Sequence, residues 1–180
     1  MSNSGLFRMA GYASLVTTLL WIVSLGVGSV NPALASPIFA AATIVFMVPV
    51  YALYIVHRAQ SSGMALGAAL LTAVGLIATL FTGDPAVPAN AILYEFSYVV
   101  FAIGIVLFGW LAYHSAKMPR GLAIAALVSG VLSLVVAIAY AGGTGMAEIA
   151  NLLNYGSNIP FFVWMIWLSL VFLSGKLATA

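Results

Sequence analysis

Six long apolar segments alternate with short polar breaks along the chain. Each can cross a bilayer as a helix, because a hydrocarbon core about 30 Å thick needs roughly 20 helical residues. The pattern predicts an all-α polytopic membrane helical bundle that occupies residues 1–180 as a single transmembrane domain. The expected transmembrane helices cover residues 6–28, 36–57, 63–82, 91–114, 122–141 and 148–175.

Proline and glycine mark bends and breaks in this pattern. Pro37 fits the first turn of the second segment, whereas Pro49 lies inside it and should bend the helix, because proline has no N–H to donate. The run at 83–88, with one glycine and two prolines, and the glycine-rich run at 142–145 indicate turns outside the membrane core. Residues 33–35 are similar to a signal-peptidase site, but the preceding apolar region is long for a signal peptide, so we expect a retained helix.

Small residues in the third and fifth segments favour close helix packing. Gly63 and Gly67 have the four-residue spacing that lets membrane helices approach, and Ala69 and Ala73 continue the row. Two serines and a glycine within 129–133 lie on one side of the fifth segment. These rows indicate packing and identify no partner.

Composition places most of the surface in lipid. Hydrophobic residues make up 64% of the chain and charged residues 4%, so a polar surface cannot cover a globular core. The net charge of +2 is too small and too dispersed for a nucleic-acid groove. The sequence has no cysteine, which excludes disulfides, thiolate metal sites and a cysteine nucleophile.

The positive charges predict the orientation in the membrane. With an inner amino terminus, six crossings place every Lys and Arg on the cytoplasmic side and none in the opposite loops. Asp84 and Glu148 then lie outside, with Glu95 at the outer end of the fourth segment. Both termini are expected to be cytoplasmic. The five cations are Arg8, Arg58, Lys117, Arg120 and Lys176.

A polar stripe enters the last segment from its outer end. Glu148, Asn151, Tyr155 and Asn158 recur at three- and four-residue steps that lead to Pro160. Helical rise puts Asn158 about 25 Å from the inner end, just inside the outer boundary of the membrane, so of this stripe it is the residue that we expect to need a partner within lipid. These groups either line a shallow outer pocket for a polar headgroup or cap and join helix ends. The pocket would consist of Tyr94, Glu95, Tyr98, Asn151, Asn154, Tyr155 and Asn158.

His57 and His114 are the only histidines, and both end a predicted helix on the cytoplasmic side. At similar depth they could hold a haem or chlorophyll-like ring, but interface residues beside basic turns are the simpler interpretation. Neither has the spacing of a zinc motif, so we expect no metal site and no cofactor. Both histidines are predicted inside and all three carboxylates outside, which argues against a Ser-His-Asp enzyme.

The membrane midplane carries hydroxyls and no ionisable residue. This pattern argues against proton-coupled transport and leaves passage of a neutral solute open. The hydroxyls are able to bond to backbone carbonyls or to neighbouring helices. They belong to Thr17, Thr18, Thr43, Thr72, Ser129, Ser133 and Ser169.

A 59-residue interval separates several similar residues, including Arg58, Lys117 and Lys176, and the aromatic positions 54, 113 and 172. Three related helical hairpins would give this rhythm. Three unrelated hairpins that cross the same bilayer, with the same interfacial anchors, give it as well.

The segment 108–115, Phe-Gly-Trp-Leu-Ala-Tyr-His-Ser, is followed by Met-Pro-Arg-Gly-Leu at 118–122. This resembles a family of uncharacterised bacterial six- or seven-helix integral membrane proteins with a Gly-x-Leu-x-Tyr-x-Ser segment before a Pro-Arg-x-Leu-Gly turn. The opening at 5–11 and the tryptophan-rich last helix are also similar, whereas Ala123 replaces the last glycine of the motif. The resemblance implies a multi-helix fold in the bacterial inner membrane and no particular activity.

These patterns together favour a noncatalytic membrane component that packs with lipid, another membrane subunit or a second copy of itself. Its outer polar region would bind a lipid or hydrophobic small molecule. A small-solute transporter is the alternative, and a lipid-modifying membrane enzyme ranks third.

Overall fold

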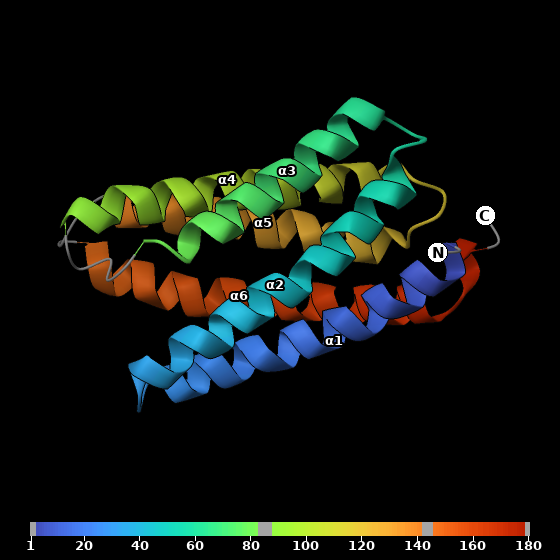
Figure 1. The fold of residues 1–180 in the computed structure, drawn as a ribbon. Coiled ribbons are helices and arrows are strands. Elements are labelled where there is room, and N and C mark those ends of the chain that lie inside the picture. Colours follow the sequence, from blue (N-terminus) through green and yellow to red (C-terminus); the bar gives the residue numbers. More distant parts are fainter. Residues whose placement is uncertain (1–2, 83–87, 142–145, 179–180) are drawn as a thin grey trace. The chain divides into compact units, whose positions relative to one another are not determined.

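The computed structural model describes residues 3–82, 88–141 and 146–178, and in these residues it consists of helices joined by short turns, with no β-strand (Figure 1). Its six α-helices are all long and apolar enough to cross a membrane, which confirms the predicted multi-pass helical fold. A short 3₁₀ helix, η2, follows the last of them. The helices are α1 Asn3–Gly28, α2 Pro32–His57, α3 Ser62–Thr79, α4 Pro88–Tyr113, α5 Arg120–Ala141, α6 Ala147–Leu173 and η2 Lys176–Ala178.

The start of α2 differs from the prediction. The helix begins at Pro32 and not at residue 36, so Pro37 as well as Pro49 lies inside it. The Asn31 carbonyl accepts hydrogen bonds from the backbone N–H groups of Leu34 and Ala35, at 3.1 and 3.3 Å. Proline suits the first helical position because its φ is already helical and its missing N–H has no partner there.

The chain divides into two compact units. The first contains Met1–Val56 and Met165–Ala180, and the second contains His57–Trp164. The first unit thus holds α1, nearly all of α2 and the end of α6. The second holds α3, α4, α5 and the larger part of α6.

In the first unit, α1 and α2 form an antiparallel hairpin (Figure 1). The Trp21 indole lies against Phe39 and Phe46, with ring centroids 6.3 and 5.2 Å away. Nearer the turn, Ser24 Oγ donates a hydrogen bond of 2.9 Å to the carbonyl oxygen of Ala35. These contacts fix which residues of the two helices lie at the same level.

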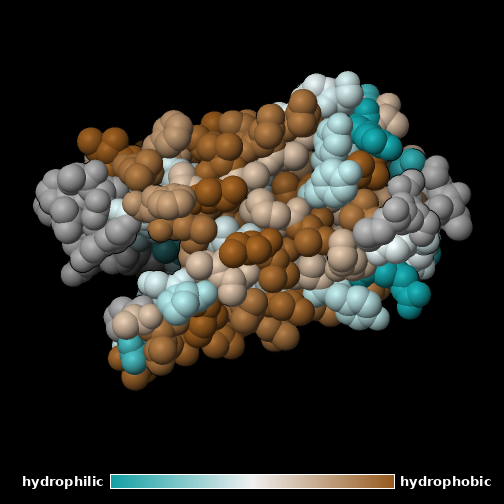
Figure 2. All heavy atoms as spheres, viewed as in Figure 1, coloured by the Kyte–Doolittle hydropathy of each residue, from teal (hydrophilic) through white to brown (hydrophobic). Residues whose placement is uncertain are grey.

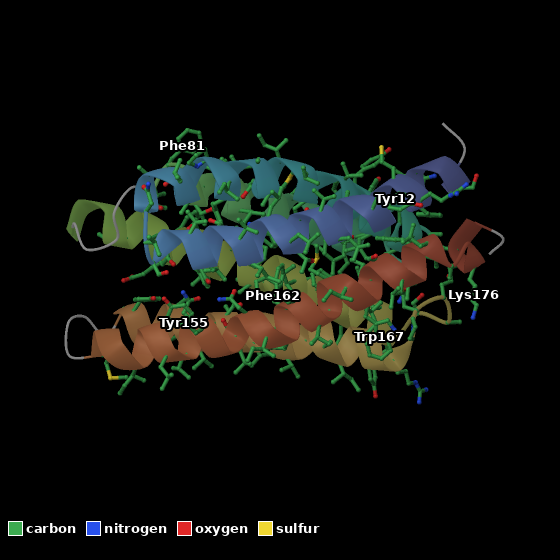
Figure 3. All side chains as sticks on the ribbon, turned by 90° about the horizontal axis from the view of Figure 1, so that it is seen from below. Tyr12, Phe81, Tyr155, Phe162, Trp167 and Lys176 are labelled. Atoms are coloured by element: carbon green, nitrogen blue, oxygen red, sulfur yellow. The ribbon has the colours of Figure 1, made fainter. Side chains whose placement is uncertain are left out.

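The end of α6 and η2 pack beside the amino-terminal part of α1. Phe7 stacks on Phe172 with their ring centroids 5.9 Å apart and an angle of 4° between the rings. Lys176 begins η2, three residues after the end of α6, and projects from this end of the unit (Figure 3). Both terminal segments of the first unit therefore meet at one end of its helices.

In the second unit, α4 packs between α3 and α5. On α3, the face in contact contains Ala65, Ala68, Thr72 and Gly75, all buried. The predicted row on Gly63 and Gly67 was the wrong face, because a Cβ on either glycine would meet no atom within 4 Å. The serine–glycine row of α5 was predicted correctly: a Cβ on Gly130 would lie 2.6 Å from Val106 Cγ2.

Large apolar side chains cover much of the exposed helix surface in both units, and Figure 2 shows them along the helices. Leu19, Ile44, Ile138 and Leu170 are more than half exposed, although each is on a long apolar helix. Such a surface is stable against lipid tails and would aggregate in water. The protein is therefore a multi-pass membrane protein.

Candidate functional site

A tyrosine–asparagine cluster joins α4, α5 and α6 at the predicted outer end of the second unit. Tyr98 Oη donates a hydrogen bond of 2.7 Å to Asn154 Oδ1. Tyr140 of α5 joins them through a ring contact with Tyr94. This hydrogen bond and the ring contacts link three helices, and we call Tyr94, Tyr98, Tyr140 and Asn154 the outer cluster.

The three tyrosine rings of the outer cluster contact one another. Tyr94 stacks on Tyr98 with centroids 5.4 Å apart and meets Tyr140 edge to face at 5.7 Å. The stacking thus covers one face of the Tyr94 ring and one face of the Tyr98 ring. Tyr140 was missed in the sequence, where a tyrosine at a helix end indicates only an interfacial anchor.

Asn158 does not reach another helix through a described hydrogen bond, although its depth suggested a partner there. Its amide nitrogen donates to the backbone carbonyl oxygen of Asn154 on its own helix, at 3.0 Å. Ser157 Oγ donates to the same oxygen at 2.8 Å. These two bonds hold the turn of α6 that carries the Asn154 amide.

The other predicted pocket residues are placed differently. Glu95 is half-buried next to Tyr94 in the chain, whereas the side chain of Tyr155 is 65% exposed. Tyr155 and Phe162 project from the same side of α6 (Figure 3). The side chains of Asn151 and Glu148 lie outside the described residues. The structure thus joins Tyr94, Tyr98 and Asn154 through one ring contact and one hydrogen bond. Tyr155 and Asn158 take part in neither of these two contacts.

An aromatic group lies deeper in the second unit, toward the middle of the same helices. Phe161 of α6 meets Phe101 of α4 edge to face at 5.9 Å and Trp164 at 5.6 Å. Phe161 and Trp164 are buried. Polar groups near the predicted membrane boundary with aromatic rings below them can orient an amphipathic molecule by its head.

The two histidines have different surroundings. His57 is fully buried beside Phe108, with Nδ1 3.4 Å from Gln60 Oε1, and Gln60 Nε2 donates to the Leu111 carbonyl oxygen at 3.3 Å. His114 is exposed, and its Nδ1 lies 2.9 Å from the Trp110 carbonyl oxygen. The Gln60 bridge between the α2–α3 turn and the end of α4 was not expected from the sequence.

Metal ligands do not gather around either histidine in the part of the chain that the structure describes. Within the described residues no three His, Cys, Asp or Glu side chains come together as metal ligands. Comparison of the chain with protein-family models, curated proteins and solved structures gives no match. What the site can do is therefore argued from its own side chains.

Proposed function

We propose that this protein is a noncatalytic component of the bacterial inner membrane that binds the head of a lipid or hydrophobic small molecule at its outer cluster. The observation that carries the proposal is the Asn154 amide, whose oxygen accepts a hydrogen bond from Tyr98. A primary amide has two N–H groups and two acceptor lone pairs, so beside the bond to Tyr98 it offers both donors and an acceptor to a ligand. The half-buried carboxylate of Glu95 adds a charge to the same end of α4.

The apolar part of the ligand would lie along α6. Tyr155 and Phe162 project from one side of this helix and offer an aromatic path from the membrane boundary inward (Figure 3). Aromatic residues at this depth favour a molecule with one wet and one apolar end. The exposed apolar surface of both units accommodates lipid chains or a partner helix equally well.

Asn154→Ala is expected to reduce the lipid or small molecule that copurifies in mild detergent by roughly tenfold, since a hydrogen-bonded polar contact is lost. Asn158→Ala is the matched control. Among the described residues its amide bonds within α6, where Ser157 still donates to the same carbonyl oxygen. Mass spectrometry of the purified proteins measures the retained molecules. Equal retention by the two variants, both folded by thermal unfolding, would reject this site.

The orientation with both termini in the cytoplasm is part of the proposal. In the first unit, Phe7 stacks on Phe172, so the neighbouring Arg8 lies at the same end as Lys176. In the second unit, the Gln60 bond to Leu111 brings together the turns that carry Arg58 and Lys117. All five cations are exposed. Clustered, exposed cations at one end of each unit support retention on the cytoplasmic side.

Single cysteines test the orientation, because the natural chain has none. Phe81, which follows α3, is 75% exposed at the end opposite the cations, and Ala116 is exposed between α4 and α5. In intact cells, a membrane-impermeant maleimide should label Phe81→Cys and leave Ala116→Cys unlabelled until the membrane is permeabilised. The reverse pattern would place the termini outside.

A small-solute transporter is the second candidate. The buried hydroxyl groups of the first unit favour it, because several of them have no hydrogen-bond partner in the described residues. A neutral solute that crosses a membrane needs such groups in place of its water. No observation on the described residues favours the third candidate, a lipid-modifying membrane enzyme.

A further inference from the structure

Buried hydroxyls in the first unit follow two different patterns. On α1, Ser14 Oγ donates to the Ala10 carbonyl oxygen at 2.9 Å, and Thr18 Oγ1 donates to the Ser14 carbonyl oxygen at 2.8 Å. This local bond is the usual solution for a hydroxyl in a membrane helix. Thr17 of α1 and Thr43 of α2 are just as buried, yet their Oγ1 atoms have no partner among the described residues.

A third hydroxyl of the first unit behaves in the same way. Ser169 of α6 is fully buried, and its Oγ has no described partner. Its backbone carbonyl oxygen lies 3.1 Å from the position that a Cβ on Gly11 would occupy, which places Ser169 at the level of Gly11 on α1. Three helices of one unit thus each contribute a buried hydroxyl without a local bond.

The helix contacts place these three residues at successive levels along the α1 axis. Ser169 lies at the level of Gly11, and Thr17 is six residues further along the same helix. Thr43 lies on α2 between Phe39 and Phe46, the two rings that contact Trp21. From Gly11 to Trp21 the α1 axis extends about 15 Å, at 1.5 Å per residue. We call Ser169, Thr17 and Thr43 the hydroxyl row.

A buried polar atom nearly always has a partner, either another protein group or an ordered water molecule. Lipid tails cannot serve, because they neither donate nor accept hydrogen bonds. The cationic side chains of the described first unit, Arg8 and Lys176, are exposed, so the row has no buried charge that would bind an ion. The chemistry that remains is a neutral ligand that both donates and accepts, as a water molecule does.

We propose that the hydroxyl row holds internal water molecules that bridge α1, α2 and α6 in the first unit. Each water would accept from one hydroxyl and donate to another or to a backbone carbonyl oxygen. The site is separate from the outer cluster and does not depend on the ligand proposed there. It would provide a hydrated stretch in the apolar interior, beginning near the basic end of α1.

Two tryptophans of the chain, Trp21 and Trp164, can serve as probes for internal water. Hydroxyl radicals produced by X-ray radiolysis of bound water oxidise the nearest side chains, so a buried tryptophan reacts quickly only beside internal water. Trp21 lies four residues after Thr17 on α1, contacts the two rings that flank Thr43 on α2 and is 6% exposed, whereas Trp164 lies against Phe161 and is 2% exposed. We expect Trp21 to be oxidised at least several-fold faster than Trp164 in the full-length protein.

Removing the hydroxyls without changing their shape completes the test. The double variant Thr17→Val/Thr43→Val should lower the oxidation rate of Trp21 to that of Trp164. Thr18→Val is the matched control, because the Thr18 hydroxyl is equally buried but already bonded to its own helix. It should leave the rate at Trp21 unchanged. Thermal unfolding verifies that each variant is folded.

Two results would overturn the proposal. One is equal oxidation of Trp21 and Trp164 in the natural protein, which would mean that no water lies near the row. The other is a rate at Trp21 that the double variant leaves unchanged, which would assign the reactivity to bulk solvent.

Discussion

Gly75→Ala is expected to destabilise the protein by about 3 kcal/mol or more, the upper range for overpacked cores, and to separate α3 from α4. A Cβ on Gly75 would lie 2.7 Å from both the Cα of Phe101 and the carbonyl oxygen of Ser97. Both are backbone atoms of α4, which cannot rotate away as a flexible side chain can. On the opposite helix, a Cβ on Gly104 would meet the backbone and side chain of Thr72, so the two helices contact through backbone at two levels.

Gly67→Ala provides the matched control on the same helix. A Cβ at Gly67 would meet no atom within 4 Å, and alanine has the higher helix propensity. We expect its stability to equal or exceed that of the natural protein by up to about 1 kcal/mol. Unfolding in mixed detergent micelles, followed by circular dichroism, measures both variants. A Gly75→Ala protein as stable as Gly67→Ala would show that α3 and α4 are not in backbone contact.

The Gly75 result bears on what a sequence can reveal about helix packing. The number of helices was predictable because it depends on sums over about 20 residues, in which single errors cancel. The packing face of α3 was not, because both Gly63–Gly67 and Ala65–Gly75 have small residues at helical spacing. Only the positions of glycines on the neighbouring helix, such as Gly104, distinguish the two rows.

Helix ends depend on one or two residues and were predicted less well. The apolar count placed the start of α2 at residue 36, whereas the Asn31-Pro32 pair begins the helix. An asparagine followed by proline is a typical helix start, so this signal was present in the sequence. In the prediction, hydropathy outweighed this signal. Hydropathy indicates which residues lie within the membrane and does not indicate where a helix begins.

The outer cluster was predictable in part. Tyr98 and Asn154 were both candidate residues, and they form the central hydrogen bond. Their pairing requires the rotation of α4 relative to α6, and no spacing within one helix contains that information. Asn158 was expected to need a partner, but an asparagine can also bond to the carbonyl oxygen four residues before it, as it does here.

The hydroxyl row shows a further limit on what can be predicted from a sequence. Thr17 and Thr18 are neighbours of the same residue type, yet only Thr18 bonds to its own helix. The choice depends on the side-chain rotamer, which the surrounding helices determine. A sequence therefore locates buried hydroxyls without revealing which of them are available to a ligand.

Trp164→Ala is expected to cost about 3 kcal/mol, the lower end of the range for losing a buried tryptophan in a soluble core. Trp164 is 2% exposed and packs on Phe161, which in turn meets Phe101 across the α4–α6 contact. In a membrane the transfer of apolar surface contributes little, because lipid tails are as apolar as the protein interior. The cost arises from the lost packing contacts and from the cavity that remains.

Trp167→Ala tests whether the free-energy cost of losing a tryptophan depends on its burial. Trp167 lies on the same helix three residues later and is 38% exposed, so lipid can fill the space that its indole leaves (Figure 3). We expect a loss below about 1 kcal/mol, typical of a surface substitution. Thermal unfolding in the same detergent compares the variants. If both tryptophans cost the same, exposure would not determine the penalty, and the aromatic group around Phe161 would add no stability beyond that of a lipid-facing side chain.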